Sequence, residues 1–297
     1  MTNVFFCVRH EAYFGESKYL TFCGLGDIIK GIVSCFLLCE KYGFNFYLNF
    51  SGSTLEKYVN TKFNQPIDTD QRIQFINSNL EEYLISNINS DIYLMTNVEL
   101  DGVFDIEGDL KINLQNYIKD LFFSNQEILN FLKFKKIFNR NILHIRFGDT
   151  PMASSDFLEN YYLKGAIPHP FNPHDWYNHF KFSDKLNLVL DSINKQSFDF
   201  DFVISDSLPV KDFFSSLWGV YCLDNKALHT GIETGCDSIF YTIVDFYTIF
   251  YGNSLVSYSA FPFGERKSAF SYIPSWFNNV KSSFFSLNFA NQTCSPL

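Results

Sequence analysis

The sequence predicts an α/β protein of two domains, each built around a mainly parallel sheet. The chain has 297 residues, which suits two domains of roughly 150 residues each. A strand–turn–helix–strand unit spans residues 19–50, and this order requires parallel pairing of the two strands. The same alternation of strands and helices returns from residue 141 onward. We place the boundary in the basic stretch 133–141 and expect domains 1–137 and 138–297.

In the first half, the element pattern is clearest near the start. The predicted strand 19–23 is followed by a turn at Gly24–Asp27 and by a helix whose apolar residues recur at helical spacing until Gly43. The remaining elements are less regular. They are strands at 44–50, 71–76 and 91–97, and an amphipathic helical pattern over 110–137.

The second half alternates short apolar strands with longer helical patterns. The predicted strands are 141–147, 200–205, 219–223 and 254–258. The helical patterns cover 174–195, 209–217 and 237–251. We expect the tail, 275–297, to begin as a terminal helix and to end as a polar coil.

Composition excludes several classes of function. The formal net charge is −9, and no basic stripe is present to displace counterions from a nucleic acid. The seven Cys show no metal-ligand spacing, and Cys35 and Cys39 lie one turn apart in an apolar helical pattern, which predicts buried reduced thiols. Lys30 and Asp245 interrupt the longest apolar stretches, so we expect no transmembrane segment. Arg9 interrupts the first apolar run, which argues against a signal peptide.

The strongest local motif is HIRFGD, residues 144–149. Strand alternation places His144 and Arg146 on one face at the carboxyl end of a strand, where open α/β sheets bind ligands. The planar guanidinium of Arg146 could hold two phosphate oxygens at once, and Gly148 would allow close approach of the backbone. Asp149 could fix Arg146 or meet a hydroxyl group. The structural alternative is a simple Arg–Asp pair at a strand end.

This motif resembles H-x-R-R-G-D of the α1,2-fucosyltransferases, and related motifs occur in α1,6-, nodulation and protein O-fucosyltransferases. The resemblance implies the GT-B fold, in which two Rossmann-like domains face each other across a cleft. It also implies that Arg146 binds the donor β-phosphate, with His144 and Asp149 alongside. Phe147 stands where the family has a second Arg.

Three further segments resemble blocks of this family, in the same order and spacing. Residues 24–27 resemble its G-L-G-N turn, and 202–213 resemble a strand that ends in S-D-S. Residues 245–270 resemble a helix with an acidic residue followed by a strand ending in S-x-S-x-F. The resemblance assigns donor binding to Gly24, Gly26, Ser205, Asp206, Ser207, Asp245, Ser257, Ser259 and Ala260, together with His144 and Arg146.

The resemblance implies an inverting glycosyltransferase that needs neither a metal ion nor another cofactor. Its donor would be a nucleotide sugar, with a GDP-sugar such as GDP-fucose favoured, and its acceptor a glycan hydroxyl. The general base is expected among Asp27, Asp156 and Asp149, in that order. Golgi enzymes of this class carry an N-terminal anchor, and its absence here points to a cytoplasmic enzyme of bacterial or viral type.

Three alternatives stay open. The first is a catalytically inactive relative that binds a sugar or nucleotide. The second is a metal-dependent GT-A transferase, for which Asp68–Asp70 or Asp199–Asp201 would be the D-x-D motif. The third is a dinucleotide oxidoreductase using Gly24 and Gly26, but its fingerprint needs a third Gly where Ile29 stands.

Overall fold

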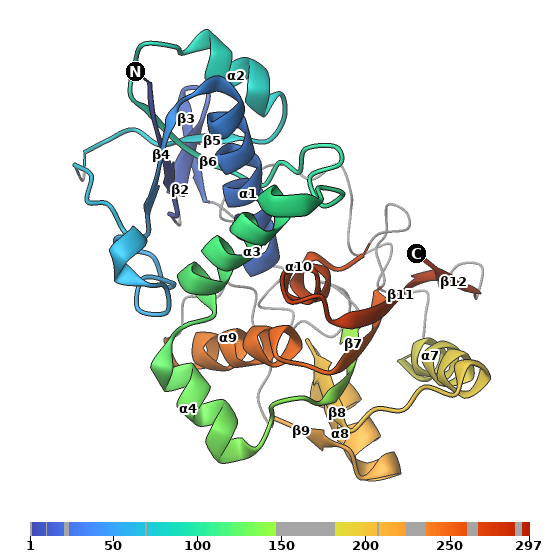
Figure 1. Ribbon diagram of the computed structural model, residues 1–297. Coiled ribbons are helices and arrows are strands. Elements are labelled where there is room, and N and C mark those ends of the chain that lie inside the picture. The colour runs from blue at the N-terminus through green and yellow to red at the C-terminus, as the bar shows by residue number, and fades with distance from the viewer. Residues whose placement is uncertain are drawn as a thin grey trace. The chain divides into compact units, whose positions relative to one another are not determined.

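The computed structural model describes residues 2–9, 11–20, 24–68, 70–146, 182–206, 208–223, 236–259, 267–288 and 293–297. Helices and two six-stranded sheets make up this part of the chain, which confirms the α/β class (Figure 1). Contacts between Cα atoms divide the chain into unit 1, Met1–Leu129, and unit 2, which begins at Asn130. Within the described ranges, no helix is both long and apolar enough to cross a membrane.

Unit 1 is built around a sheet with the strand order β3-β2-β5-β6-β1-β4. Its interior pairings are parallel, and only the hairpin of β2 and β3 is antiparallel. The strands are β1 (Asn3–Cys7), β2 (Glu11–Phe14), β3 (Ser17–Leu20), β4 (Asn45–Asn49), β5 (Gln74–Ile76) and β6 (Ile92–Thr96). The helices are α1 (Leu25–Tyr42), the short 3₁₀ helix η1 (Thr61–Phe63), α2 (Leu80–Ser86) and α3 (Gly108–Phe122).

The predicted opening strand, 19–23, overlaps β3 at residues 19–20, and residues 21–23 lie outside the described residues, but its expected parallel pairing with the strand at 44–50 is wrong. The strand β3 ends at Leu20 and pairs antiparallel with β2, whereas the parallel partner of β4 is β1. The chain therefore inserts a hairpin between β1 and the helix that crosses to β4. The burial of β1 alternates from Asn3 to Phe6, so one face of this strand is more deeply buried than the other.

Helix α1 packs against the end of β6 through a glycine. A Cβ atom built on Gly31 would lie 1.9 Å from the carbonyl oxygen of Thr96, so only glycine fits this contact. The helix ends at Gly43, whose φ of 67° lies in the left-handed region. Cys35 and Cys39 are buried free thiols on this helix, and burial raises the pKa of Cys39 to about 12.

Unit 2 contains the second sheet, with the strand order β12-β11-β10-β7-β8-β9. All its pairings are parallel except that of β11 with β12. The strands are β7 (Asn141–Arg146), β8 (Phe202–Ser205), β9 (Tyr221–Cys222), β10 (Ser254–Ser259), β11 (Lys281–Asn288) and β12 (Thr293–Pro296). The helices are α4 (Gln126–Lys135), which begins in unit 1, α7 (Phe182–Gln196), α8 (Leu208–Trp218), α9 (Cys236–Phe250) and α10 (Ala269–Phe277).

Two expectations for the helices and the tail are corrected. The helical pattern over 110–137 is two helices, α3 and α4, because the side chain of Asn125 accepts hydrogen bonds from the backbone of Glu127 and Ile128 and so caps a new helix. The tail is not a helix followed by coil. After α10 it forms β11 and β12, since Phe284, Phe285 and Leu287 are buried when β11 extends the sheet beside β10.

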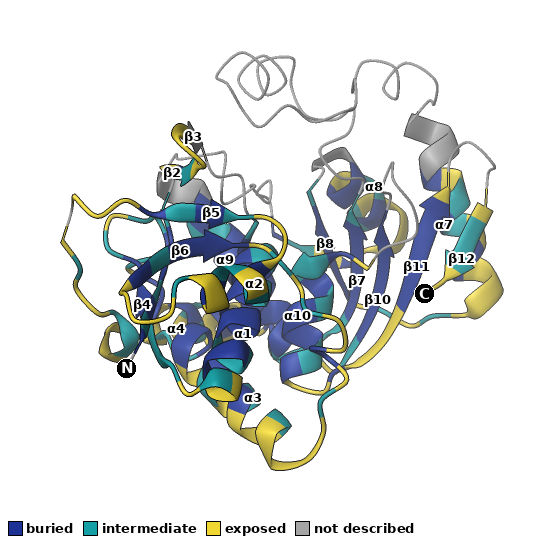
Figure 2. Ribbon diagram, turned by 90° about the horizontal axis from the view of Figure 1, so that it is seen from above, coloured by how far each residue is buried: buried dark blue, intermediate teal, exposed yellow. Residues whose placement is uncertain are grey.

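The two faces of the second sheet bury different kinds of side chain. One face presents Leu143, Ile145, Val203 and Tyr258 to the apolar residues of α7 and α8. The other face carries His144, which stacks on Phe270 of α10. The central strands β7 and β10 are buried between these two helix layers (Figure 2). The sheet thus keeps an apolar core on one face and a polar position on the other.

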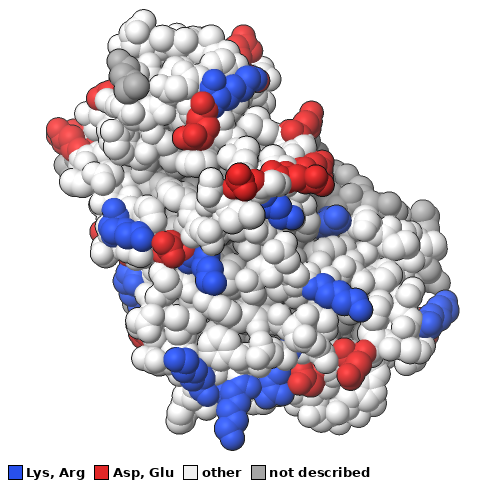
Figure 3. Space-filling view, in the orientation of Figure 1, with Lys and Arg blue, Asp and Glu red and all other residues white. Residues whose placement is uncertain are grey.

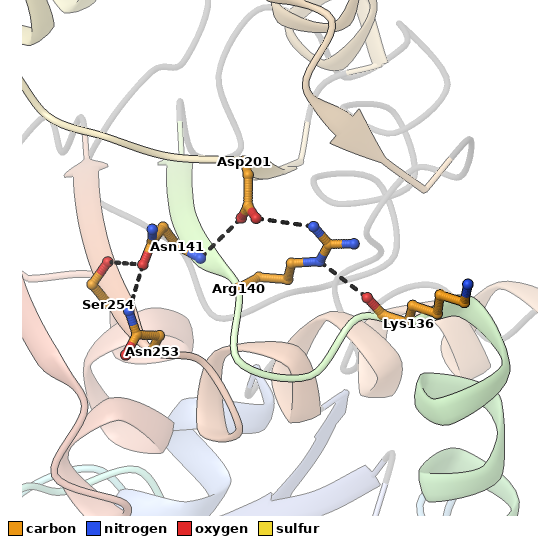
Figure 4. A network of polar contacts seen from close by, with 6 residues as sticks. All are labelled: Lys136, Arg140, Asn141, Asp201, Asn253 and Ser254. Carbon is orange, nitrogen blue, oxygen red and sulfur yellow. Dashed lines mark hydrogen bonds and ion pairs between the residues drawn. The ribbon is translucent and has the colours of Figure 1, made fainter.

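A polar network ties together the amino ends of the strands in unit 2 (Figure 4). Asp201 accepts hydrogen bonds from Arg140 at 2.9 Å and from the backbone N–H of Asn141 at 2.9 Å. The side chain of Asn141 in turn accepts from Asn253 and from Ser254, each at 2.8 Å. This network fixes the register of β7 against its neighbours at the end of the sheet opposite Arg146.

Candidate functional site

The carboxyl end of β7 brings together several of the residues singled out by sequence. In the register of the sheet, His144 lies opposite Ser257 and Arg146 opposite Ser259, both on β10. Because side chains alternate along a strand, these four residues share one face. His144, Ser257 and Ser259 are buried, whereas Arg146 is half-buried at the last position of the strand.

A chain of hydrogen bonds holds the ring of His144. The carbonyl oxygen of Ser268 can only accept, so the hydroxyl of Ser271 donates to it at 3.2 Å. The oxygen of Ser271 then accepts from Ser257 at 2.9 Å, and the oxygen of Ser257 accepts from Nδ1 of His144 at 2.9 Å. These directions place the imidazole proton on Nδ1 and leave Nε2 with its lone pair.

The imidazole of His144 is uncharged. Burial and, to a smaller extent, the positive charge of Arg146 together lower its pKa from 6.5 to about 3. Among the described residues at this strand end, the site therefore combines the cation Arg146 with a neutral ring two residues earlier on the same strand. Such an arrangement can bind an anion at Arg146.

The end of β8 contributes Ser205 and Asp206. Ser205 is buried, and its hydroxyl donates to the carbonyl oxygen of Ile145 on β7 at 2.8 Å. This bond joins the two strand ends next to Arg146. Asp206 follows directly and is half-buried.

Asp245 lies on α9 as a buried carboxylate, paired with a residue that the sequence analysis did not single out. Its Oδ2 atom lies 3.6 Å from Nζ of Lys211 on α8, both side chains are 1% exposed, and neither carboxylate oxygen makes a hydrogen bond. Nζ of Lys211 donates to the carbonyl oxygen of Leu223 at 3.2 Å. Burial raises the pKa of Asp245, and the charge of Lys211 opposes that shift. Lys211 lies on the buried side of α8 with Val210 and Phe214.

The glycine turn lies at the start of α1 in unit 1. Gly24 precedes the helix in an extended conformation, and its carbonyl oxygen accepts from the backbone N–H of Ile28. Gly26 is buried in the first turn. Asp27 forms an ion pair with Lys30 at 3.0 Å, and Lys30 reaches Glu99 at 3.4 Å. Burial acts to lower the pKa of Lys30, but the two carboxylates outweigh it and raise that pKa.

Four of the expected site residues lie outside the described residues, namely Asp149, Asp156, Ser207 and Ala260. Phe147 and Gly148 of the same motif also lie there.

One carboxylate of each acidic pair weighed as metal ligands is engaged otherwise. Both carboxylate oxygens of Asp201 accept hydrogen bonds, and this residue lies at the amino end of β8, not at its carboxyl end. A carboxylate oxygen of Asp68 accepts from the backbone N–H of Asp70 in an exposed turn. Among the residues that the structure describes, no group of three or more His, Cys, Asp or Glu could hold a metal ion.

Comparison with known proteins assigns the chain to no family. No protein-family model matches the chain, and none of the curated proteins matches it in sequence. The functional argument therefore depends on the site itself and on the motif around Arg146.

Proposed function

We propose that the protein is a glycosyltransferase of the GT-B kind that moves a sugar from a nucleotide diphosphate to a glycan hydroxyl. The observation that supports this most is the position of Arg146. It ends an interior strand of a parallel sheet, half-buried, beside Ser259 and above a neutral His144. Ligands of open α/β sheets bind beyond the carboxyl ends of the strands, and a guanidinium matches two phosphate oxygens. The HxRxGD motif, which resembles that of fucosyltransferases, supports a GDP-sugar as the donor.

The proposed reaction is one in-line displacement at the anomeric carbon. The acceptor oxygen forms a bond to this carbon while the bond from the carbon to the diphosphate oxygen breaks, which inverts the configuration. The proton of the acceptor hydroxyl passes to a carboxylate, for which Asp27, Asp156 and Asp149 are our candidates in that order. Arg146 and backbone amides neutralise the departing diphosphate, an effect typically worth ~3–4 kcal/mol per donor group.

The hydrogen-bond chain behind His144 gives this proposal a physical basis. A second positive charge beside Arg146 would be costly in a buried site, and the neutral imidazole avoids it. Because Ser257 and Ser271 hold the ring and Phe270 stacks on it, the strand end is rigid before a ligand arrives. A prearranged cation needs little reorganisation to bind a diphosphate.

Thermal denaturation with nucleotides tests the proposal. We expect GDP to raise the unfolding temperature more than UDP, CMP or dTDP, since a ligand stabilises by RT ln(1 + [L]/Kd). Arg146→Ala should abolish both this shift and sugar transfer, and Arg146→Lys should be poor because an ammonium cannot form the two-pronged contact. Arg140→Ala is the matched control, because Arg140 lies at the other end of the same strand in a purely structural network.

The outcomes separate the interpretations. Normal binding and transfer by Arg146→Ala would overturn the proposal. Nucleotide binding that depends on Arg146 without transfer to any glycan would instead indicate an inactive binding protein.

A further inference from the structure

Exposed apolar and basic side chains gather on one end of unit 2. The last turn of α4 carries Lys133, Phe134 and Lys135, Lys136 follows directly, and Phe134 is 80% exposed. Leu217 and Trp218 at the end of α8 and Tyr221 on β9 are also exposed. We call these seven residues the basal patch. Four of the five exposed large hydrophobic residues described in unit 2 belong to it, which is more than scattered exposure would give.

A groove connects the separate segments of the basal patch. It has a volume of about 470 Å³ and runs along the edge strand β9. One wall comes from α4 and α9, with Phe131, Lys135 and Tyr241. The other comes from Ser215 on α8 and from residues 219–223. Segments about 80 residues apart in sequence therefore form one surface, with an ammonium group and hydroxyl groups at the groove.

The positive charge of the patch is not neutralised within the described part of the chain. Lys133, Lys135 and Lys136 form no ion pair with any described carboxylate. The ammonium of Lys135 instead lies 5.9 Å and 5.8 Å from the ring centres of Phe131 and Phe134. Figure 3 shows basic side chains gathered at the lower end of α4. The neighbouring Asp201 is already paired with Arg140. In a chain of net charge −9, this is a local cationic surface that fits an anionic partner.

We propose that the basal patch docks on an anionic lipid membrane surface. A projecting Phe between lysines costs free energy in water, but at a bilayer surface its ring enters the boundary of the acyl chains while the lysines meet lipid phosphates. Trp and Tyr prefer the same interfacial depth, and both occur in the patch. The groove beside Lys135 has room for a phosphate headgroup. The inference is independent of the proposed transfer reaction, because no patch residue belongs to the strand end at Arg146.

Sedimentation of the full chain with vesicles tests the proposal. We expect binding to vesicles of phosphatidylcholine and phosphatidylserine, little binding to phosphatidylcholine alone, and release by high salt. Each lysine near an anionic surface contributes roughly a fivefold gain, so Lys133→Gln/Lys135→Gln/Lys136→Gln should weaken binding on the order of 100-fold. The matched control, Lys57→Gln/Lys111→Gln/Lys119→Gln, makes the same charge change in unit 1 and should bind like the wild type.

A second pair of variants isolates the apolar contribution. Phe134→Ser should weaken vesicle binding about tenfold, whereas Ile112→Ser, which changes another exposed apolar residue in unit 1, should leave it unchanged. The proposal is overturned if the wild type does not sediment with anionic vesicles, or if the patch variants bind as tightly as their controls. The rise in unfolding temperature with GDP should be the same in the patch variants as in the wild type. This measurement separates a failure of the membrane proposal from a failure of the proposed transferase function.

Discussion

At the scale of single residues, burial determines the charge of His144. Its folded-state pKa of about 3 lies below the value of 6.5 expected in the unfolded chain. Between these two values the unfolded chain binds one more proton at this position. The stabilisation is therefore complete above pH 6.5 and is lost as the pH falls toward 3.

We accordingly predict that His144 makes the protein sensitive to mild acid. Its contribution to the free energy of unfolding should fall by about 1.4 kcal/mol per pH unit below pH 6.5. Denaturant unfolding at pH 7.5, 6 and 5 measures this slope in the wild type and in His144→Gln. An equal slope in both proteins would show that His144 is not the residue responsible.

The buried pair of Lys211 and Asp245 supports a second prediction at this scale. Removing one partner leaves an uncompensated buried charge, so Lys211→Met or Asp245→Leu alone should cost ~3–5 kcal/mol of stability. The double variant should recover most of that loss, since apolar side chains of similar size fill the same space. The exposed pair Lys62–Asp120 is the control, and its coupling energy should stay below ~1 kcal/mol. Additive losses at the buried pair would contradict the prediction.

At the scale of elements, sequence periodicity predicted most of the second half of the chain. The strands β7, β8, β9 and β10 lie within about two residues of their predicted positions, as boundary uncertainty allows. These strands are short apolar runs between clear helical patterns. Predictions failed where the local pattern was ambiguous, as in β11, whose Ser- and Phe-rich sequence becomes a strand only through pairing with β10.

The candidate site was predictable only in part, for a physical reason. Alternation along β7 correctly implies that His144 and Arg146 share a face. It cannot reveal Lys211, because the pairing of this residue with Asp245 depends on how α8 and α9 pack around β9. Long-range contacts of this kind leave no periodic signal in a single sequence.

The contact of α1 with β6 gives a prediction about Gly31. Alanine usually stabilises a helix by about 1 kcal/mol over glycine. Here its Cβ atom would overlap the backbone of Thr96, which cannot rotate away, and overpacking costs ~1–3 kcal/mol or more. The steric term should dominate, so Gly31→Ala should lower the free energy of unfolding. Glu40→Ala, on the exposed side of the same helix, should be nearly neutral. A stabilised Gly31→Ala would show that α1 can shift away from β6.

At the scale of the whole molecule, both units follow one plan. Each has a six-stranded sheet whose interior pairings are parallel and which closes with one antiparallel strand at an edge. In unit 1 the polar residue Asp27 lies in the first turn of the crossing helix α1. In unit 2 the polar residues Arg146 and Asp206 lie at the carboxyl ends of the parallel strands β7 and β8. This repeated plan is consistent with the two α/β domains that the sequence predicts, and the proposed reaction would need contributions from both.

For the complete protein we predict that sugar transfer and nucleotide binding persist in EDTA. The proposed site uses Arg146 to neutralise the diphosphate. Of the acidic residues weighed as metal ligands, Asp68 is engaged in a turn and Asp201 in the network around Asn141. Transfer assays with and without chelator, on protein loaded with the preferred nucleotide, measure this. Activity that is lost in EDTA and restored by Mn²⁺ or Mg²⁺ would favour a metal-dependent transferase.

The pairing of Lys211 with Asp245 also constrains how this sequence can diverge. A lineage that replaces only one of the two residues must pass through a protein carrying an unbalanced charge in its interior, and selection against unfolding removes such intermediates. We therefore expect descendants of a common ancestor to keep both residues or to have exchanged both for apolar ones. Joint retention or joint replacement of these two positions, which lie 34 residues apart, would identify distant homologues even where the residues around Arg146 have diverged.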